Sequence, residues 1–200
     1  MQRNLVGIVT ILIWGTGLLL PSAAMAQQAL VIKTMAEKKV AELPEGQLFW
    51  RIENFPTLAE AKGVTGSTGL TVESAGKVWL FSLGPKGGST AGGIKVAEVG
   101  PIPRVAATQY LLRINEASGP PGSTTAVHSH PGSEAFYVLN GEQSIRSPAG
   151  VMRVSVGQPE AGQGADVPMQ VSSSGSTDLL ALVMFVLDAT KPASSPAKFP

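Results

Sequence analysis

The chain has 200 residues and nearly balanced charge, with 15 Lys and Arg against 14 Asp and Glu. No block of like charge is present, which argues against nucleic acid and against an anionic membrane surface as partners. The sequence contains no cysteine, so disulfides, thiolate metal sites and thiol nucleophiles are excluded.

Residues 1–26 have the composition of a secretory signal peptide. A positive charge at Arg3 precedes an apolar run from Leu5 to Leu20, and small residues then lead to a cleavage site after Ala26. An uncleaved membrane anchor is the alternative, but a span needs about 20 apolar residues. We therefore expect a mature protein that is periplasmic or secreted and has no membrane attachment.

The rest of the chain is expected to be all-β, because short apolar runs alternate with turns rich in Gly and Pro. We expect residues 27–108 to form an N-terminal extension that packs on a barrel. The extension is predicted to contain one helix over residues 29–43 and a second over residues 56–62. The linker GPKGGSTAGG, residues 84–93, is expected to be flexible. Strands are predicted at residues 48–52, 69–72, 77–83, 109–115, 125–130, 135–139, 143–146, 152–156, 167–172 and 179–188.

We expect residues 109–190 to form the barrel itself. Residues 191–200, which are rich in Pro and Ser, are expected to form a flexible tail. Within the barrel, Asn140-Gly141 separates two apolar runs. Both residues tolerate positive φ, so this pair predicts a two-residue hairpin turn between the flanking strands.

Both histidines of the chain lie in the string GSTTAVHSHPGSEAFYVLNG. Residues two apart on a strand point to the same face, so His128 and His130 are expected to project together. The turn Pro131-Gly132-Ser133 is expected to bring Glu134 to the same interior. Two imidazoles and a carboxylate are a ligand set for a divalent transition metal.

This string resembles the first motif of the cupin superfamily, which has the form G-x5-H-x-H-x3-E-x6-G. Gly122, His128, His130, Glu134 and Gly141 fill that motif with every spacing intact. The resemblance implies a double-stranded β-helix, also called a jelly-roll barrel, with metal ligands on its inner wall. It also implies a homodimer that pairs through elements outside the barrel.

The second motif of the cupin superfamily, G-x5-P-x-G-x2-H-x3-N, lacks its histidine in this chain. Counting from Gly157 places the histidine position at Pro168, whereas matching the final strand places it at Met169. The later asparagine position falls on Ser172 or Ser173.

Three interpretations follow from the missing histidine. In the first, His128, His130 and Glu134 alone form a two-histidine, one-carboxylate site, with open positions for water and substrate. In the second, Met169 adds a thioether ligand, which favours copper. In the third, the metal is lost and the histidines bind a small organic molecule or a sugar through hydrogen bonds.

The sequence does not distinguish Fe, Mn, Zn, Ni and Cu as the metal. Alternation along the strand after Glu134 predicts that Phe136 and Val138 also line the barrel, and Gln170 offers an amide group to the same pocket. The predicted partner is a small-molecule ligand. Oxygenase- or isomerase-like chemistry is the expectation from the family resemblance, and a non-catalytic, metal-free binding protein is the alternative.

Overall fold

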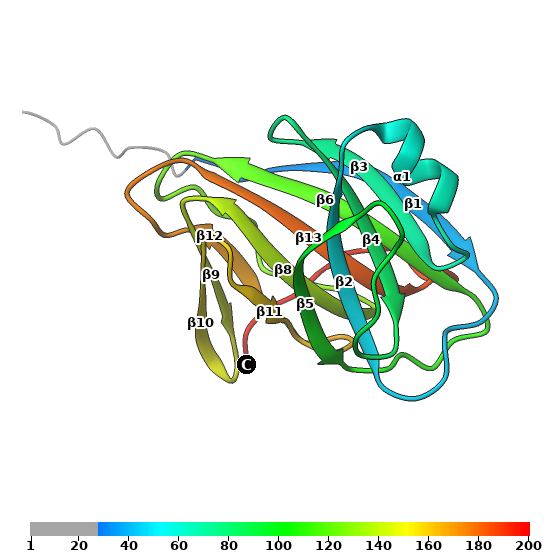
Figure 1. Ribbon diagram of the computed structural model, residues 1–200. Coiled ribbons are helices and arrows are strands. Elements are labelled where there is room, and N and C mark those ends of the chain that lie inside the picture. The colour runs from blue at the N-terminus through cyan, green and yellow to red at the C-terminus, as the bar shows by residue number, and fades with distance from the viewer. Residues whose placement is uncertain (1–27) are drawn as a thin grey trace, which may run out of the picture.

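The computed structural model describes residues 28–200, and the predicted signal peptide lies outside this part of the chain. Most of the described residues form antiparallel strands (Figure 1). Residues 28–200 contain no helix with the length and apolar character that crossing a bilayer requires.

The elements follow one another along the chain from the N-terminal strand to the C-terminal tail. The first half contains β1 (Val31–Val40), β2 (Leu48–Phe55), α1 (Leu58–Val64), β3 (Gly69–Ser74), β4 (Lys77–Gly84) and β5 (Ile94–Ile102). The second half contains β6 (Tyr110–Gly119), β7 (His128–Ser129), β8 (Gly132–Asn140), β9 (Glu142–Ser147), β10 (Gly150–Ser155), β11 (Pro159–Ala161), β12 (Gln170–Ser173), β13 (Leu179–Asp188) and β14 (Ser195–Pro196).

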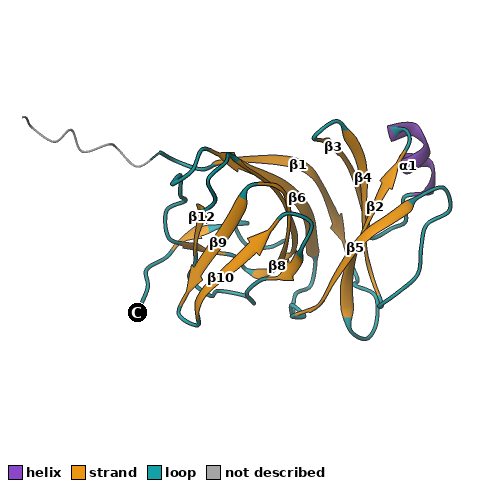
Figure 2. Ribbon diagram, turned by 60° about the vertical axis from the view of Figure 1, so that its left-hand side comes forward, coloured by secondary structure: helices purple, strands orange, loops and turns teal. Residues whose placement is uncertain are grey.

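Two facing sheets form the barrel. The larger sheet has the order β1-β6-β13-β8-β11, and the smaller one has the order β10-β9-β12. In Figure 2 the smaller sheet lies in front of the curved larger sheet. Ile145 and Val171 of the small sheet pack with Phe136 and Val183 of the large sheet, which closes one side of the barrel interior.

A further sheet, with the order β3-β4-β2-β5, covers the outer face of the large barrel sheet. Leu182 and Met184 of β13 point to this sheet and pack with Trp50 and Phe81. Val183, between them, points into the barrel, as the two-residue period of a strand requires. The central strands of the barrel are therefore buried on both faces.

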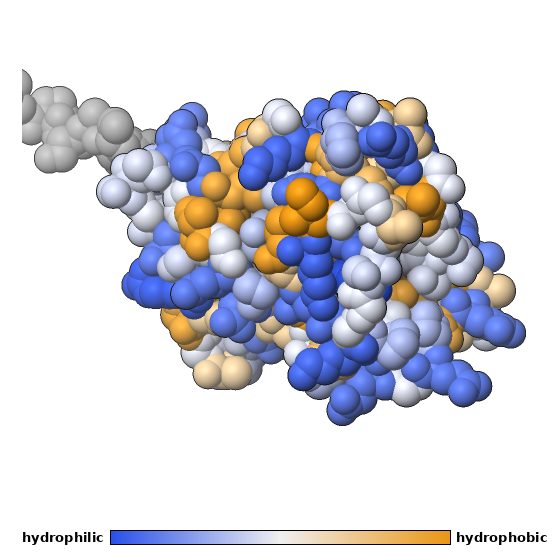
Figure 3. All heavy atoms as spheres, in the orientation of Figure 1, coloured by the Kyte–Doolittle hydropathy of each residue, from blue (hydrophilic) through white to orange (hydrophobic). Residues whose placement is uncertain are grey.

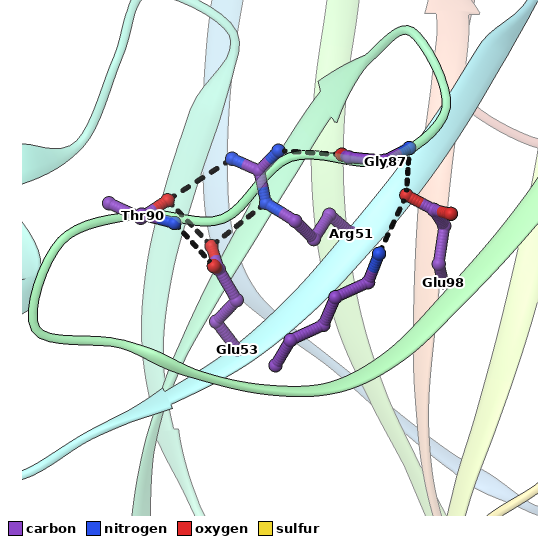
Figure 4. A network of polar contacts seen from close by, with 6 residues as sticks. Arg51, Glu53, Gly87, Thr90 and Glu98 are labelled. Atoms are coloured by element: carbon purple, nitrogen blue, oxygen red, sulfur yellow. Dashed lines mark hydrogen bonds and ion pairs between the residues drawn. The ribbon is translucent and has the colours of Figure 1, made fainter.

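The linker between β4 and β5, residues 85–93, is bound to β2 by a network of hydrogen bonds that includes an ion pair (Figure 4). Glu53, which is fully buried, accepts hydrogen bonds from the backbone N–H of Thr90 at 2.7 Å, from the Thr90 hydroxyl at 2.6 Å and from Arg51 Nε at 3.0 Å. Arg51 also donates to the carbonyl of Gly87. The linker expected to be flexible is thus anchored by polar contacts at two points.

The prediction of a helix over residues 29–43 is wrong, because this segment contains β1 at the edge of the barrel sheet. Its Ala, Lys and Glu residues favour a helix locally, but antiparallel pairing with β6 along the ten-residue strand outweighs that preference. The strand carries a bulge between Thr34 and Ala36. A segment expected to lie outside the barrel therefore contributes a strand to it.

The second predicted helix is confirmed as α1. It begins after Thr57, whose hydroxyl accepts a hydrogen bond from the backbone N–H of Glu60 at 3.2 Å and so caps the helix. By contrast, β5 has no counterpart among the predicted strands. Ile94 and Val96 of β5 are exposed, so this edge strand lacks the buried apolar run that identifies a strand in a sequence.

The prediction of a hairpin at Asn140-Gly141 is also wrong. β8 pairs with β13 and β11, whereas β9 pairs with β10 and β12, so the chain crosses from one sheet to the other at Gly141. Gly141 has a φ of 75°, and a Cβ there would lie 2.7 Å from the carbonyl oxygen of Asp178. The turn residues therefore form a barrel corner, and the two-residue hairpin loop lies between β9 and β10.

The end of the chain, for which the sequence predicts a flexible tail, lies against the barrel. β14 pairs with β7, and the backbone N–H of Ala197 donates to the carbonyl of Val127 at 3.1 Å. The Arg146 guanidinium lies over the Phe199 ring, 4.5 Å from its centroid.

On the face drawn in Figure 3, apolar side chains are exposed in separate patches among polar ones.

Candidate functional site

The two histidines lie at the edge of the barrel interior, on and next to the short strand β7. The backbone of His128 pairs with that of Met169, with N–H to carbonyl distances of 2.9 and 2.7 Å. The rings of His128 and His130 lie edge to face, with their centroids 4.9 Å apart. Both side chains line one cavity, as the alternation of a strand predicts.

Glu134 lines the same cavity from β8. It pairs with Phe185 of β13, and its side chain is only 2% exposed. Its Oε2 atom lies 3.8 Å from Nε2 of His130. A Cβ on residue 162 would lie 2.5 Å from Cγ of Glu134. The backbone at Gly162 can therefore approach the Glu134 side chain this closely only because residue 162 is glycine.

The rings of both histidines are oriented through their Nδ1 atoms. His130 Nδ1 lies 2.6 Å from the carbonyl oxygen of Ala193, and His128 Nδ1 lies 2.9 Å from that of Ala126. Since a carbonyl only accepts, each Nδ1 carries the hydrogen and donates it. The Nε2 atoms are left with free lone pairs, the arrangement in which imidazole binds a metal.

Burial shifts the pKa of Glu134 and that of His130 in opposite directions. It raises the pKa of Glu134 to about 8, against the weaker effect of the backbone N–H of Gln163. It lowers the pKa of His130 to about 4, although the bond to Ala193 acts in the other direction. Both groups are therefore neutral at pH 7, and Oε1 of Glu134 has no hydrogen-bond partner within residues 28–200.

The structure thus brings the predicted metal ligands only partly together. His130 and Glu134 approach each other, and His128 contacts His130. Among residues 28–200, however, no three His, Asp or Glu side chains are placed to hold a metal ion together. Met169 lies opposite His128, as matching the final strand predicts, but it is buried in the apolar core and does not line the cavity.

The cavity has a volume of about 490 Å³, within the range of small-molecule sites. Its walls are mainly apolar and include Leu30, Phe136, Val171, Val183, Phe185 and Leu187.

Only part of the predicted pocket lines this cavity. Phe136 does so. Val138 is buried in the adjoining core without lining it, and the Gln170 amide donates to the carbonyl of Thr125 at 3.1 Å.

Several polar residues that line the cavity were not among the predicted site residues, and three of them have charged or amide side chains. Arg113 and Asn115 of β6 occupy inward positions two residues apart, and Gln143 of β9 faces the cavity from the small sheet. Arg113 is bound to Glu37 of β1, with its Nη2 atom 2.7 Å from the carboxylate. Alternation along β6 and along β9 indicates which face of its own strand Asn115 or Gln143 occupies, but the meeting of the two faces in one cavity depends on strand pairing that the sequence pattern does not show.

No protein-family model matches the chain, and no curated protein matches it in sequence. Similar solved structures include the DMSP lyase DddQ of Ruegeria pomeroyi, with 20% identity, a TM-score of 0.37 and coverage of 43% of each chain. A cupin-like protein of Thermotoga maritima has 15% identity and a TM-score of 0.38, over 44% of this chain and 65% of that chain. The polyketide cyclase RemF of Streptomyces resistomycificus has 18% identity and a TM-score of 0.37, over 44% and 62%.

The chain spans less than half the length of the DMSP lyases that it matches. The strand pairing itself defines a jelly-roll barrel of two facing antiparallel sheets, so the predicted all-β barrel is confirmed. The predicted N-terminal extension of helices and strands contains the four-stranded sheet and α1, whereas β1 belongs to the barrel. Several of the similar structures are cupins by name. What the cavity binds rests on its own residues.

Proposed function

We propose that this protein binds a small organic molecule in its barrel cavity, together with a divalent transition metal held by His130, Glu134 and His128. The observation that carries the proposal is the approach of His130 Nε2 and Glu134 Oε2, 3.8 Å apart at the cavity wall. Both side chains are almost fully buried, and Glu134 Oε1 has no hydrogen-bond partner within residues 28–200. A buried carboxyl oxygen without a partner is costly, so it marks a site that binds something.

The chemistry of these side chains fits a metal. Imidazole nitrogens and a carboxylate suit Fe, Mn, Zn, Ni or Cu, and the Nδ1 bonds to backbone carbonyls fix the rings as in known metal sites. A bound metal would polarise an oxygen of the organic ligand. Glu134 must lose its proton to act as a ligand, so metal affinity is expected to rise with pH up to about 8.

The test is to measure metal binding by the full chain after removal and restoration of metal. Zn²⁺ and Mn²⁺ are titrated by calorimetry, and bound metal is counted by elemental analysis. We expect one ion per chain, and a loss of affinity of at least about 100-fold in His130→Ala and Glu134→Gln, since each removes a ligand.

The matched control is Glu160→Gln, which changes an exposed carboxylate of β11 that pairs with Phe136. This variant is expected to keep the native affinity. Native protein that takes up no metal, or a Glu134→Gln variant that binds as tightly as the native chain, would contradict the metal site.

The second candidate function is metal-free binding of a small organic molecule in the same cavity. Two observations favour it: the walls are mainly apolar, and no three potential ligands in residues 28–200 are gathered at one point. In that case the free Nε2 atoms of His128 and His130 accept hydrogen bonds from the ligand. Glu134→Gln distinguishes the two candidates, because replacing the carboxylate by an amide is expected to weaken metal binding and to leave metal-free binding of the organic molecule in place.

Export follows as a proposal from the signal-peptide pattern of residues 1–26. A homodimer and oxygenase- or isomerase-like catalysis are implied by the family resemblance alone and stay predictions. Sedimentation of the mature chain would test the first of these, and screening for turnover after metal loading would test the second.

A further inference from the structure

Two carboxamide side chains line the barrel cavity and have polar atoms without a hydrogen-bond partner among residues 28–200. Gln143 is fully buried, and neither its Oε1 nor its Nε2 atom is hydrogen-bonded within residues 28–200. Asn115 is 8% exposed, and its Oδ1 atom is likewise without a partner. Each such group costs free energy in the folded state unless a bound molecule supplies the hydrogen bond.

The two carboxamides face the cavity from opposite sheets, away from the histidines. Asn115 pairs with Val183, which pairs with Phe136, so these three residues form one row across the large sheet. Glu134 belongs to the neighbouring row, two residues earlier on β8, which corresponds to about 7 Å along the strand. Gln143 lies near the start of β9, just after the corner at Gly141.

The surroundings of the carboxamides restrict the ligand to an uncharged group. Apart from Glu134 and the two histidines, Arg113 is the one ionisable side chain among the residues that line the cavity, and it is paired with Glu37. A carboxamide both donates and accepts, and its two ends exchange by rotation. The best partner is therefore a neutral group with the same double capacity.

We propose that Asn115 and Gln143 form a polar subsite that binds a hydroxyl or carboxamide group of an uncharged, mainly apolar organic ligand. The rings of Phe136 and Phe185 and the side chain of Val183 supply the apolar walls around the rest of that molecule. A hydroxylated aromatic ring has this combination of properties. The proposal rests on the proposed binding of a small molecule in this cavity, but it does not require the metal.

The test uses a pair of probes of equal shape in the metal-free full chain. 4-Methylphenol carries the hydroxyl group, and 1,4-dimethylbenzene has a methyl group in its place. Both are titrated while backbone amide shifts are followed by NMR. An apolar cavity favours the dimethylbenzene, whereas the subsite is expected to favour 4-methylphenol by at least about tenfold, because the hydrocarbon leaves buried polar groups unpaired.

Gln143→Met and Asn115→Leu are expected to abolish this preference. Both substitutions replace an unpartnered buried amide by an apolar group of similar size, so the variants are expected to fold and to melt no lower than the native chain. Gln170→Met is the matched control. Gln170 does not line the cavity, and its amide donates to the backbone carbonyl of Thr125, so the preference should be retained.

A native preference for 4-methylphenol that is lost in Gln143→Met and Asn115→Leu, and kept in Gln170→Met, supports the subsite. Equal or tighter binding of 1,4-dimethylbenzene by the native chain overturns the subsite while leaving a binding cavity. An unchanged preference in both cavity variants overturns it as well. If neither probe binds, the proposed small-molecule function itself fails, and the subsite fails with it.

Discussion

Two buried glutamates in this protein have opposite surroundings. Glu53 lies in the outer sheet and accepts hydrogen bonds from Thr90 and Arg51 at both carboxylate oxygens. Glu134 lies in the barrel, where Oε1 has no hydrogen-bond partner in the described part of the chain and Oε2 is 3.8 Å from Nε2 of His130. Burial raises the pKa of both groups, but the bonds to Glu53 outweigh it and hold that pKa below its usual value.

The difference in hydrogen bonding indicates that Glu53 has a structural role and Glu134 a role in binding. The charge of Glu53 is matched by the protein itself, so its role is complete in the fold: it holds the linker of residues 85–93 against β2. The Oε1 atom of Glu134 has no hydrogen-bond partner in residues 28–200, and the carboxyl group faces a cavity. A protein keeps such a group where a ligand completes its bonding.

The largest expected effect is that of Glu53→Ala. This change leaves Arg51 and the backbone N–H of Thr90 without their acceptor, and we expect a loss of about 3 kcal/mol in the free energy of unfolding. Urea denaturation at pH 7 measures it. In the same assay Glu134→Gln should cost little or nothing, because the native carboxyl group is already neutral. A loss under about 1 kcal/mol for Glu53→Ala would contradict the structural role of Glu53.

The next effect is a pH dependence that belongs to Glu134. Its folded pKa of about 8 lies above the usual 4.5, so its contribution to stability is fully present below pH 4.5 and is lost as the pH rises through 8. His130 has a folded pKa of about 4 against the usual 6.5, so its contribution is lost as the pH falls through 4 and is complete above 6.5.

Between pH 6.5 and 8, therefore, only Glu134 changes its contribution. The metal-free native chain is expected to lose about 1 to 2 kcal/mol of unfolding free energy over this window. Glu134→Gln should show no such loss. Denaturation at a series of pH values measures both, and parallel curves for the two proteins would show that Glu134 ionises normally.

A smaller effect is expected from the tail. Ending the chain after Thr190 removes the carbonyl of Ala193, which orients His130. Metal affinity should then fall about tenfold, because the group that fixes a metal-binding imidazole is lost. Phe199→Ala, which removes the contact with Arg146 and keeps the carbonyl of Ala193, is the control and should keep the native affinity. Equal Zn²⁺ affinity of the shortened and native chains would remove the tail from the site.

The smallest effect concerns Glu37. Its carboxylate is 50% exposed and pairs with Arg113 at 2.7 Å. Because solvent screens such a pair, Glu37→Gln should cost less than about 1 kcal/mol in urea denaturation. A cost equal to that of Glu53→Ala would show that exposure does not separate the two pairs.

The candidate site was predictable where it depends on the alternation of one strand. His128 and His130 share a face, and Glu134 and Phe136 share the inward face of β8, because both pairs are two residues apart. Asn115 and Gln143 come from strands distant in sequence from the histidines and from each other. Their facing depends on the closure of the barrel, which local patterns do not contain.

The errors in the predicted fold have the same origin. The segment of β1 has helix-forming residues, and only the pairing with β6 makes it a strand. Asn140-Gly141 is a strong local turn signal, yet the choice between a hairpin and a barrel corner depends on which strands pair on either side. Strands with a buried apolar run, such as β13, were predicted at their full length, because a continuous run of apolar residues indicates a buried strand without knowledge of its partners.

The most direct test of the contrast between the two glutamates is a carboxyl ¹³C NMR titration of metal-free native protein that follows both in one sample. We expect Glu134 to titrate near pH 8 and Glu53 below 4.5, with the Glu134 midpoint moving to lower pH when Zn²⁺ is added. A Glu134 that titrates near 4.5 and does not respond to Zn²⁺ would contradict the account of the barrel as a binding site.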